Sequence, residues 1–118
     1  MRSLKGGLKS LIKKLIIDSL KPLNIPICFQ KYSGKAETYI TFHEYLEAGE
    51  EYDEDEESLT AHYVQVDVWS KTDYTSIVKE VKSLLIAAGF KRLNEIDLYE
   101  EDTKIYHKGL KFYYLEER

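Results

Sequence analysis

The strand, turn and helix that follow one another between His62 and Gly89 constrain the fold more than any other part of the chain. In the strand, apolar and polar positions alternate with a period of two, which is typical of a strand with one buried face. One face carries His62, Val64, Val66 and Val68. The opposite face carries Ala61, Tyr63, Gln65, Asp67 and Trp69. The valine face is therefore predicted to face a core.

The helix after the turn is predicted from apolar residues that recur three and four positions apart. These residues are Tyr74, Ile77, Val78, Val81, Leu84, Leu85 and Ala88. Asp73 or Thr72 can cap the first turn through a side-chain oxygen. Gly89 stands where a left-handed residue is expected to end the helix.

The rest of the chain predicts one further helix and four further strands. The helix is expected over residues 8–20 and ends before Pro22, and the strands are expected over 25–32, 38–46, 90–99 and 104–115. The last strand turns Leu110, Phe112 and Tyr114 inward. A chain of 118 residues has room for one domain. We therefore predict a single α+β domain over 1–118, of about five mostly antiparallel strands with two helices packed on one face, in the order α-β-β-β-α-β-β.

An acidic run separates the strand at 38–46 from the strand that ends at Trp69. Its eight carboxylates are Glu47, Glu50, Glu51, Asp53, Glu54, Asp55, Glu56 and Glu57, with no Lys or Arg among them. The net charge of the chain is −4, so without these eight it would be +4. We expect residues 47–58 to form a charged loop between two antiparallel strands, and residues 1–7 to be a flexible lead-in.

Catalytic and metal-binding patterns are not found in the sequence. The histidines, His43, His62 and His107, fall on different predicted strands without ligand-like spacing to a Cys or a carboxylate. Counted from Asp53, the acidic run lacks the glycine and glutamate of a calcium-binding loop. Cys28, the one cysteine, lies in an apolar run and is expected to be a buried thiol. We expect no enzyme activity, no metal and no cofactor.

Membrane insertion and nucleic-acid binding are also disfavoured. The chain lacks the run of about 18 apolar residues that spans a bilayer. Its pI of about 5.4 and its acidic run would repel a phosphate backbone, so we expect no direct sequence-specific binding to nucleic acid.

The strand from Tyr63 to Lys71 that leads into a helix with Tyr74, preceded by a Tyr39-Ile-Thr-Phe strand and a charged segment, resembles tail completion proteins of long-tailed bacteriophages and prophages. These include tail terminators and head-to-tail joining proteins. The similarity covers residues 8–115 in length, element order and the strand-turn-helix core. It implies a virion protein, assembled in the bacterial cytoplasm, that forms a ring, typically a hexamer, at the head-proximal end of the tail tube. Its partners would be further copies of itself, the tail-tube protein and the head completion or connector protein.

Two groups of residues are candidates for assembly contacts. Four aromatic side chains point away from the predicted core: Tyr39, Tyr45, Tyr63 and Trp69. The second layer of an ordinary core is the competing explanation for them. The resemblance implies that residues 47–58 correspond to a long loop that would face the ring lumen or a neighbouring ring. Seven carboxylates of this segment are therefore candidates: Glu50, Glu51, Asp53, Glu54, Asp55, Glu56 and Glu57. A solvated loop without a partner is the competing explanation here, and an acidic inhibitor of a host factor, of the DNA-mimic type, is the alternative function.

Overall fold

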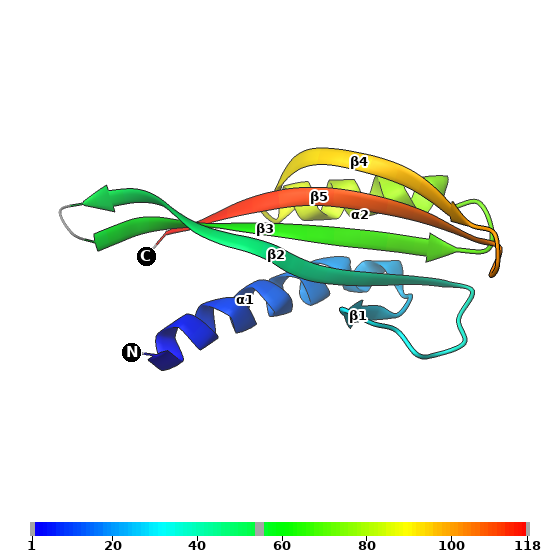
Figure 1. Cartoon of the computed structure of the whole chain (residues 1–118), viewed down its shortest axis with the longest axis horizontal. Coiled ribbons are helices and arrows are strands. Elements are labelled where there is room, and N and C mark those ends of the chain that lie inside the picture. The colour runs from blue at the N-terminus through cyan, green and yellow to red at the C-terminus, as the bar shows by residue number, and fades with distance from the viewer. Residues whose placement is uncertain (1, 54–55, 118) are drawn as a thin grey trace.

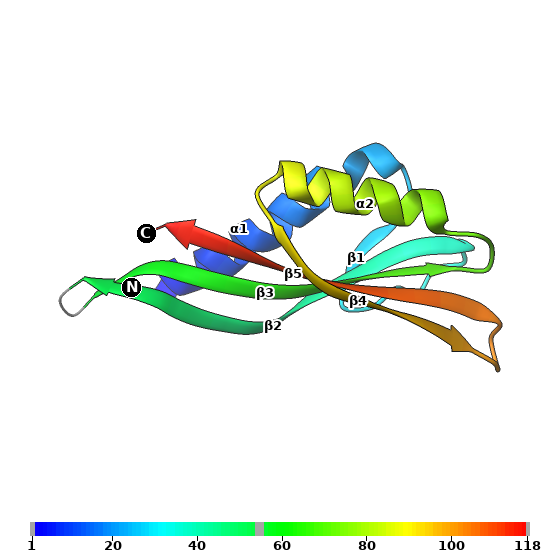
Figure 2. The same cartoon turned by 90° about the horizontal axis from the view of Figure 1, so that it is seen from above.

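Five strands form one mixed sheet, and both helices lie on the same face of it (Figures 1 and 2). The computed structural model describes the backbone of residues 2–53 and 56–117, and the side chains of residues 11–46 and 59–117. The elements are α1 (Arg2–Leu20), the 3-10 helix η1 (Lys21–Leu23), β1 (Ile27–Phe29), β2 (Thr38–Asp53), β3 (Glu56–Ser70), α2 (Thr75–Ala87), β4 (Lys91–Glu100) and β5 (Ile105–Glu117). This confirms the predicted α+β class and element order.

The strand order in the sheet is β1-β2-β3-β5-β4. Strand β1 runs parallel to β2, and the other three neighbouring pairs are antiparallel. Strand β3 lies in the middle, so that β2 and β5 pair with its two sides. The predicted hairpins β2–β3 and β4–β5 are therefore both present.

The core lies between the sheet and the two helices. The valine face of β3 is almost wholly buried, as the alternation predicted. Helix α1 contributes Ile12, Ile16 and Leu20, and α2 contributes Val78, Val81 and Leu85. From the sheet, Ile40 and Phe42 of β2 and Leu110 and Phe112 of β5 complete the same cluster. Burying one apolar stripe of each helix on one sheet face satisfies both helices at once.

The predicted loop at 47–58 is wrong for the backbone that the structure describes. Strand β2 continues to Asp53 and β3 begins at Glu56, with Tyr52 opposite Glu57 and Asp53 opposite Glu56. Pairing of the two strands continues through the acidic run, with register shifts between Glu44 and Leu46, Gly49 and Glu51, and Glu51 and Tyr52, and only residues 54–55 separate the two strands. Glu54 and Asp55 lie outside the described residues.

The predicted lead-in at 1–7 is also wrong for residues 2–7, because α1 begins at Arg2, and Met1 lies outside the described residues. Leu4 precedes Leu8 by four positions, so the helical apolar spacing extends one turn further toward the N-terminus than we predicted. Gly6 and Gly7 each weaken a helix by about 1 kcal/mol, but the helix includes both.

Asp73 bonds the first turn of α2 as predicted, although the N-cap position itself is Tyr74, which makes no side-chain cap bond. Oδ1 of Asp73 accepts hydrogen bonds from the backbone N–H of Thr75 (3.0 Å) and from its hydroxyl (2.7 Å). At the other end Gly89 has a positive φ of 107°. The N–H of Gly89 donates to the carbonyl of Ile86, and the N–H of Phe90 donates to the carbonyl of Leu85. This pair of bonds is a Schellman motif, which turns the chain from α2 into β4.

Replacing Gly89 with alanine tests this motif. A side chain is strained at φ 107°, and its Cβ would lie 3.0 Å from Cε1 of Tyr114. We expect Gly89→Ala to lower the free energy of unfolding by about 1–2 kcal/mol. Urea denaturation followed by circular dichroism measures the change, and an unaltered midpoint would contradict this account of the helix end.

Candidate assembly surface

The face of the sheet turned away from the helices, here called the open face, carries aromatic side chains arranged in two rows. The first row crosses β2, β3 and β5, where Tyr39, Trp69 and His107 occupy directly opposite positions. The indole of Trp69 stacks on the imidazole of His107 with centroids 3.8 Å apart, and the ring of Tyr39 lies 5.9 Å from that of Trp69. Tyr32 extends the row beyond β2, with its ring 4.4 Å from that of Tyr39. These contacts make a continuous aromatic strip across the sheet.

The second row lies further along the same strands. The ring of Tyr63 lies 6.1 Å from that of Tyr45 and 5.8 Å from that of Tyr113. Nζ of Lys111 lies 5.0 Å from the centroid of the Tyr45 ring, within reach of a cation–π contact. Partial burial raises the pKa of the Tyr45 hydroxyl above its ordinary value. This end of the row presents a phenol beside a cation.

Polar bonds fix the first row in place. The indole N–H of Trp69 donates to Oγ1 of Thr41 at 2.9 Å. Oδ1 of Asp67, whose residue is 5% exposed, accepts bonds from Nε2 of His107 at 2.7 Å and from Nε2 of Gln65 at 2.8 Å. Side chains held in this way lose little rotamer freedom when a partner covers them.

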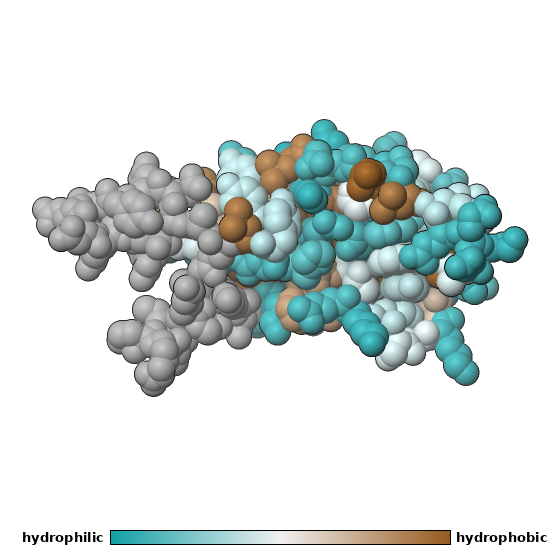
Figure 3. Space-filling view, in the orientation of Figure 1, coloured by the Kyte–Doolittle hydropathy of each residue, from teal (hydrophilic) through white to brown (hydrophobic). Residues whose placement is uncertain are grey.

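Apolar side chains of β4 border the open face. Leu93, Ile96 and Leu98 are 44%, 55% and 45% exposed. Ile96 is opposite Gly109, whose Cα hydrogen leaves room for Ile96, Gln65 and Asp67 to approach from the open face. In the space-filling view, brown residues gather over β4 beside the paler centre of the sheet (Figure 3).

The structure brings together the four aromatic residues predicted from the sequence. All four lie on the open face, where Tyr39 contacts Trp69 in the first row and Tyr45 contacts Tyr63 in the second. Their location is as predicted, whereas their role in assembly stays a prediction. The β5 members of the two rows, His107, Lys111 and Tyr113, were missed. The signal was present, because they alternate with the inward residues of that strand.

The acidic candidates are placed only in part. Glu50, Glu51 and Asp53 belong to β2, and Glu56 and Glu57 belong to β3. For these five residues the structure describes the backbone alone, and Glu54 and Asp55 are outside it. The hairpin of β2 and β3 extends beyond the helices at one end of the molecule (Figure 1).

A second polar site lies on the helix-covered face. His62 is fully buried, with Nδ1 2.7 Å from Oε2 of Glu44 and Nε2 2.9 Å from Oε1 of Glu116. Burial by itself lowers the pKa of His62, but the hydrogen bonds and charges of Glu44 and Glu116 outweigh it and raise the pKa above the ordinary value. A protonated ring can donate to both carboxylates at once, so this site links β3 to β2 and to β5.

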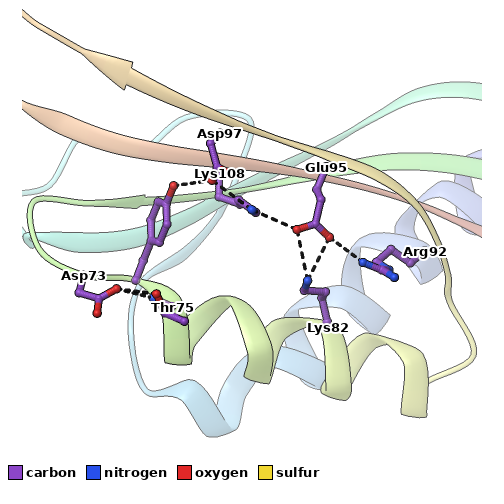
Figure 4. A network of polar contacts seen from close by, with 8 residues as sticks. Asp73, Thr75, Lys82, Arg92, Glu95, Asp97 and Lys108 are labelled. Atoms are coloured by element: carbon purple, nitrogen blue, oxygen red, sulfur yellow. Dashed lines mark hydrogen bonds and ion pairs between the residues drawn. The ribbon is translucent and has the colours of Figure 1, made fainter.

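An ion-pair network fastens β4 and β5 to α2 (Figure 4). The carboxylate of Glu95 accepts from Lys82, Lys108 and Arg92, at 2.7–3.2 Å. The bond from Lys82 is the main cause that lowers the pKa of Glu95 to about 2. The Tyr74 hydroxyl donates to Asp97 at 2.8 Å, and burial followed by this bond raises the pKa of Tyr74 to about 12. These ion pairs therefore connect β4 to α2 through Lys82 and to β5 through Lys108.

Neither metal-binding nor membrane-spanning geometry is found in the described part of the chain. Across the described side chains, no group of three or more His, Cys, Asp or Glu residues is placed to hold a metal ion. None of the described helices is long and apolar enough to cross a membrane. His43, His62 and His107 lie on β2, β3 and β5, on two different faces of the sheet.

Comparison with known proteins adds no relative: no family model and no curated protein matches this chain.

Replacing His62 tests the buried polar site. We expect His62→Gln to cost about 3 kcal/mol of unfolding free energy, because it leaves two partly buried carboxylates without a cation between them. Urea denaturation measures the loss, with His43→Gln, which changes a histidine of the open face, as the matched control.

The pH dependence of the same site has a definite sign. Because the folded pKa of His62 is raised, its contribution is fully present below the unfolded value of 6.5 and is lost as the pH rises through the folded value. As the pH rises above 6.5, wild-type stability should therefore fall by more than that of His62→Gln. Parallel curves for the two proteins would show that His62 does not titrate as described.

Proposed function

We propose that the protein is a non-enzymatic structural protein of a bacteriophage or prophage tail. Six copies form a ring at the head-proximal end of the tail, end the growth of the tail tube and join it to the head connector. The protein is assembled in the bacterial cytoplasm and resides in the virion. The open face is the observation that carries this proposal, together with the resemblance to tail completion proteins.

An antiparallel sheet with one solvated face ordinarily carries polar side chains on that face. Here the corresponding positions carry two aromatic rows, with Tyr45 41% exposed and Trp69 half-buried. Tyrosine and tryptophan are enriched in protein interfaces, because they bury a large rigid surface and keep a polar tip. The open face therefore suits contact with another protein surface, and in a ring each copy presents it to a different surface of the next copy.

The acidic hairpin suits a second contact. Its sequence carries eight carboxylates with no Lys or Arg, and its strands extend beyond the helices (Figure 1). The molecule is correspondingly elongated, at 52 × 26 × 25 Å. An extended acidic arm can reach a basic surface outside its own subunit, such as a neighbouring ring or the connector.

The same hairpin favours one alternative, an acidic inhibitor of the DNA-mimic type that occupies a DNA-binding protein of the host. Such a protein would act as a monomer and would inhibit a nuclease. The tail proposal requires assembly on tail tubes, so ring formation on tail tubes distinguishes the two functions.

The open face is tested by the double variant Tyr45→Ser/Tyr63→Ser. The matched control is Tyr99→Ser/Tyr106→Ser, because Tyr99 is 44% exposed, close to the 41% of Tyr45, and pairs with Tyr106 at the other end of the sheet. We expect wild type and control to form rings on purified tail tubes and the open-face variant to lose them. Electron microscopy and light scattering give the readout. Equal assembly by both variants would refute the role of the open face, and a monomer that inhibits a nuclease would favour the alternative.

The hairpin is tested by changing its seven candidate carboxylates to serine. The changed residues are Glu50, Glu51, Asp53, Glu54, Asp55, Glu56 and Glu57. The control changes Glu100, Glu101 and Asp102, which are exposed acidic residues at the β4–β5 turn. We expect head-to-tail joining in vitro to fall at least about tenfold for the hairpin variant alone, because charged groups across an interface guide its formation. Unchanged joining would remove the hairpin from the mechanism.

A further inference from the structure

Strand β2 loses its outer neighbour partway along its length. The three residues of β1 pair with Ile40, Thr41 and Phe42. The N–H of Gln30 donates a last bond to the carbonyl of Phe42 at 2.7 Å, and Gln30 then turns the chain away with a φ of 69°. From residue 43 to residue 53, β2 has β3 on one side and no described strand on the other. Such an edge is a template for another extended chain.

An apolar groove lies beside the start of this free edge. It has a volume of about 370 Å³, and α1 forms one wall with Ile12, Lys13 and Ile16. Glu44 of β2 also lines the groove, and Nζ of Lys13 lies 4.3 Å from the centroid of the Phe29 ring. Phe29 closes the end at β1, and Leu46 lies on the β2 side. Phe29 is 40% exposed and Leu46 is 51% exposed, so both have apolar surface left to bury.

We propose that this edge and groove bind an extended segment of another protein, which pairs with β2 as an added strand. Backbone bonds to β2 supply the pairing, and alternate side chains of the segment enter the groove beneath α1. Tyr45 of the open face also lines this groove, but the β2 edge and the apolar groove carry the inference, which does not rest on the proposed function.

Charge indicates what kind of segment fits. Next to the groove, the segment must present apolar side chains to Phe29 and Leu46, whose surfaces remain exposed. Beyond Leu46, β2 enters the acidic run, where carboxylates occur with no Lys or Arg. The part of the segment that lies there is therefore basic. The partner is an extended segment with alternating apolar residues at one end and lysines or arginines at the other.

The β4 edge of a second copy fits this groove poorly. On its helix-side face, β4 presents Glu95 and Asp97, which already pair with Lys82 and Lys108. Pairing β4 with β2 in the same sheet would direct these carboxylates toward the apolar groove, and burying them there is costly. A segment of a different protein is therefore the occupant that the chemistry favours.

The probe for the test is a fluorescein-labelled peptide of alternating valine and threonine that ends in three lysines, made with the lysines at either terminus. We expect one of the two peptides to bind saturably, as measured by fluorescence anisotropy. Its binding should also slow hydrogen exchange of the backbone amides of residues 43–53. Proline at the alternate positions should weaken binding at least about tenfold, because proline cannot donate a backbone bond. Glutamate in place of the lysines should do the same.

Two variants link the binding to this groove. Leu46→Glu should weaken binding at least about tenfold, because it places a charge at the apolar groove wall. The matched control is Leu98→Glu, on the opposite edge of the sheet, where leucine is 45% exposed. Absence of saturable binding, equal binding by the proline peptide, or equal loss in both variants would overturn the proposal. Wild-type dimers in light scattering that Leu46→Glu dissociates would also overturn it, in favour of a second copy as occupant.

Discussion

Every other element of this fold depends on the alternation of side chains in β3. Strand β3 pairs along its length with β2 on one side and β5 on the other, so its two faces define the two faces of the sheet. Its valines are at most 1% exposed and lie beneath both helices. Because α1 and α2 bury their apolar stripes on the same face of the sheet, neither helix covers the opposite face. The face that carries Tyr63 and Trp69 must therefore be stable in water and also available to a partner.

The open face meets both requirements through stacking and polar bonds. Trp69 lies between Tyr39 and His107, and its indole N–H is bound by Thr41. The carboxylate of Asp67 accepts hydrogen bonds from His107 and from Gln65, two positions earlier on the same strand. Each polar tip bound in this way avoids the cost of an unmade hydrogen bond. The rings also bury part of their surface against one another, which limits the apolar area in contact with water without removing it.

The period-two pattern of β3 predicted its buried and open faces correctly, because side-chain direction in a strand is a local property. The sequence could not predict features that arise from register and crossing. His62 meets Glu116 across 54 positions of the chain, which depends on the pairing of β3 with β5. The groove depends on where α1 crosses the sheet and on the departure of the chain at Gln30, a residue without the usual preference for positive φ. The acidic run misled the prediction because its composition resembles a loop, whereas strand pairing continues through the described part of it.

The two edges of the sheet avoid unwanted pairing by different means. Strand β4 has a register shift between Arg92 and Glu95, and its ion pairs with Lys82 and Lys108 hold it against the body of the protein. The free part of β2 has register shifts between Glu44 and Leu46, Gly49 and Glu51, and Glu51 and Tyr52, and it also carries the acidic run. Two copies that paired through this edge would bring like charges together, and such pairing is unfavourable. A basic segment meets no such barrier, so the charge that keeps the edge from pairing with itself also selects its partner.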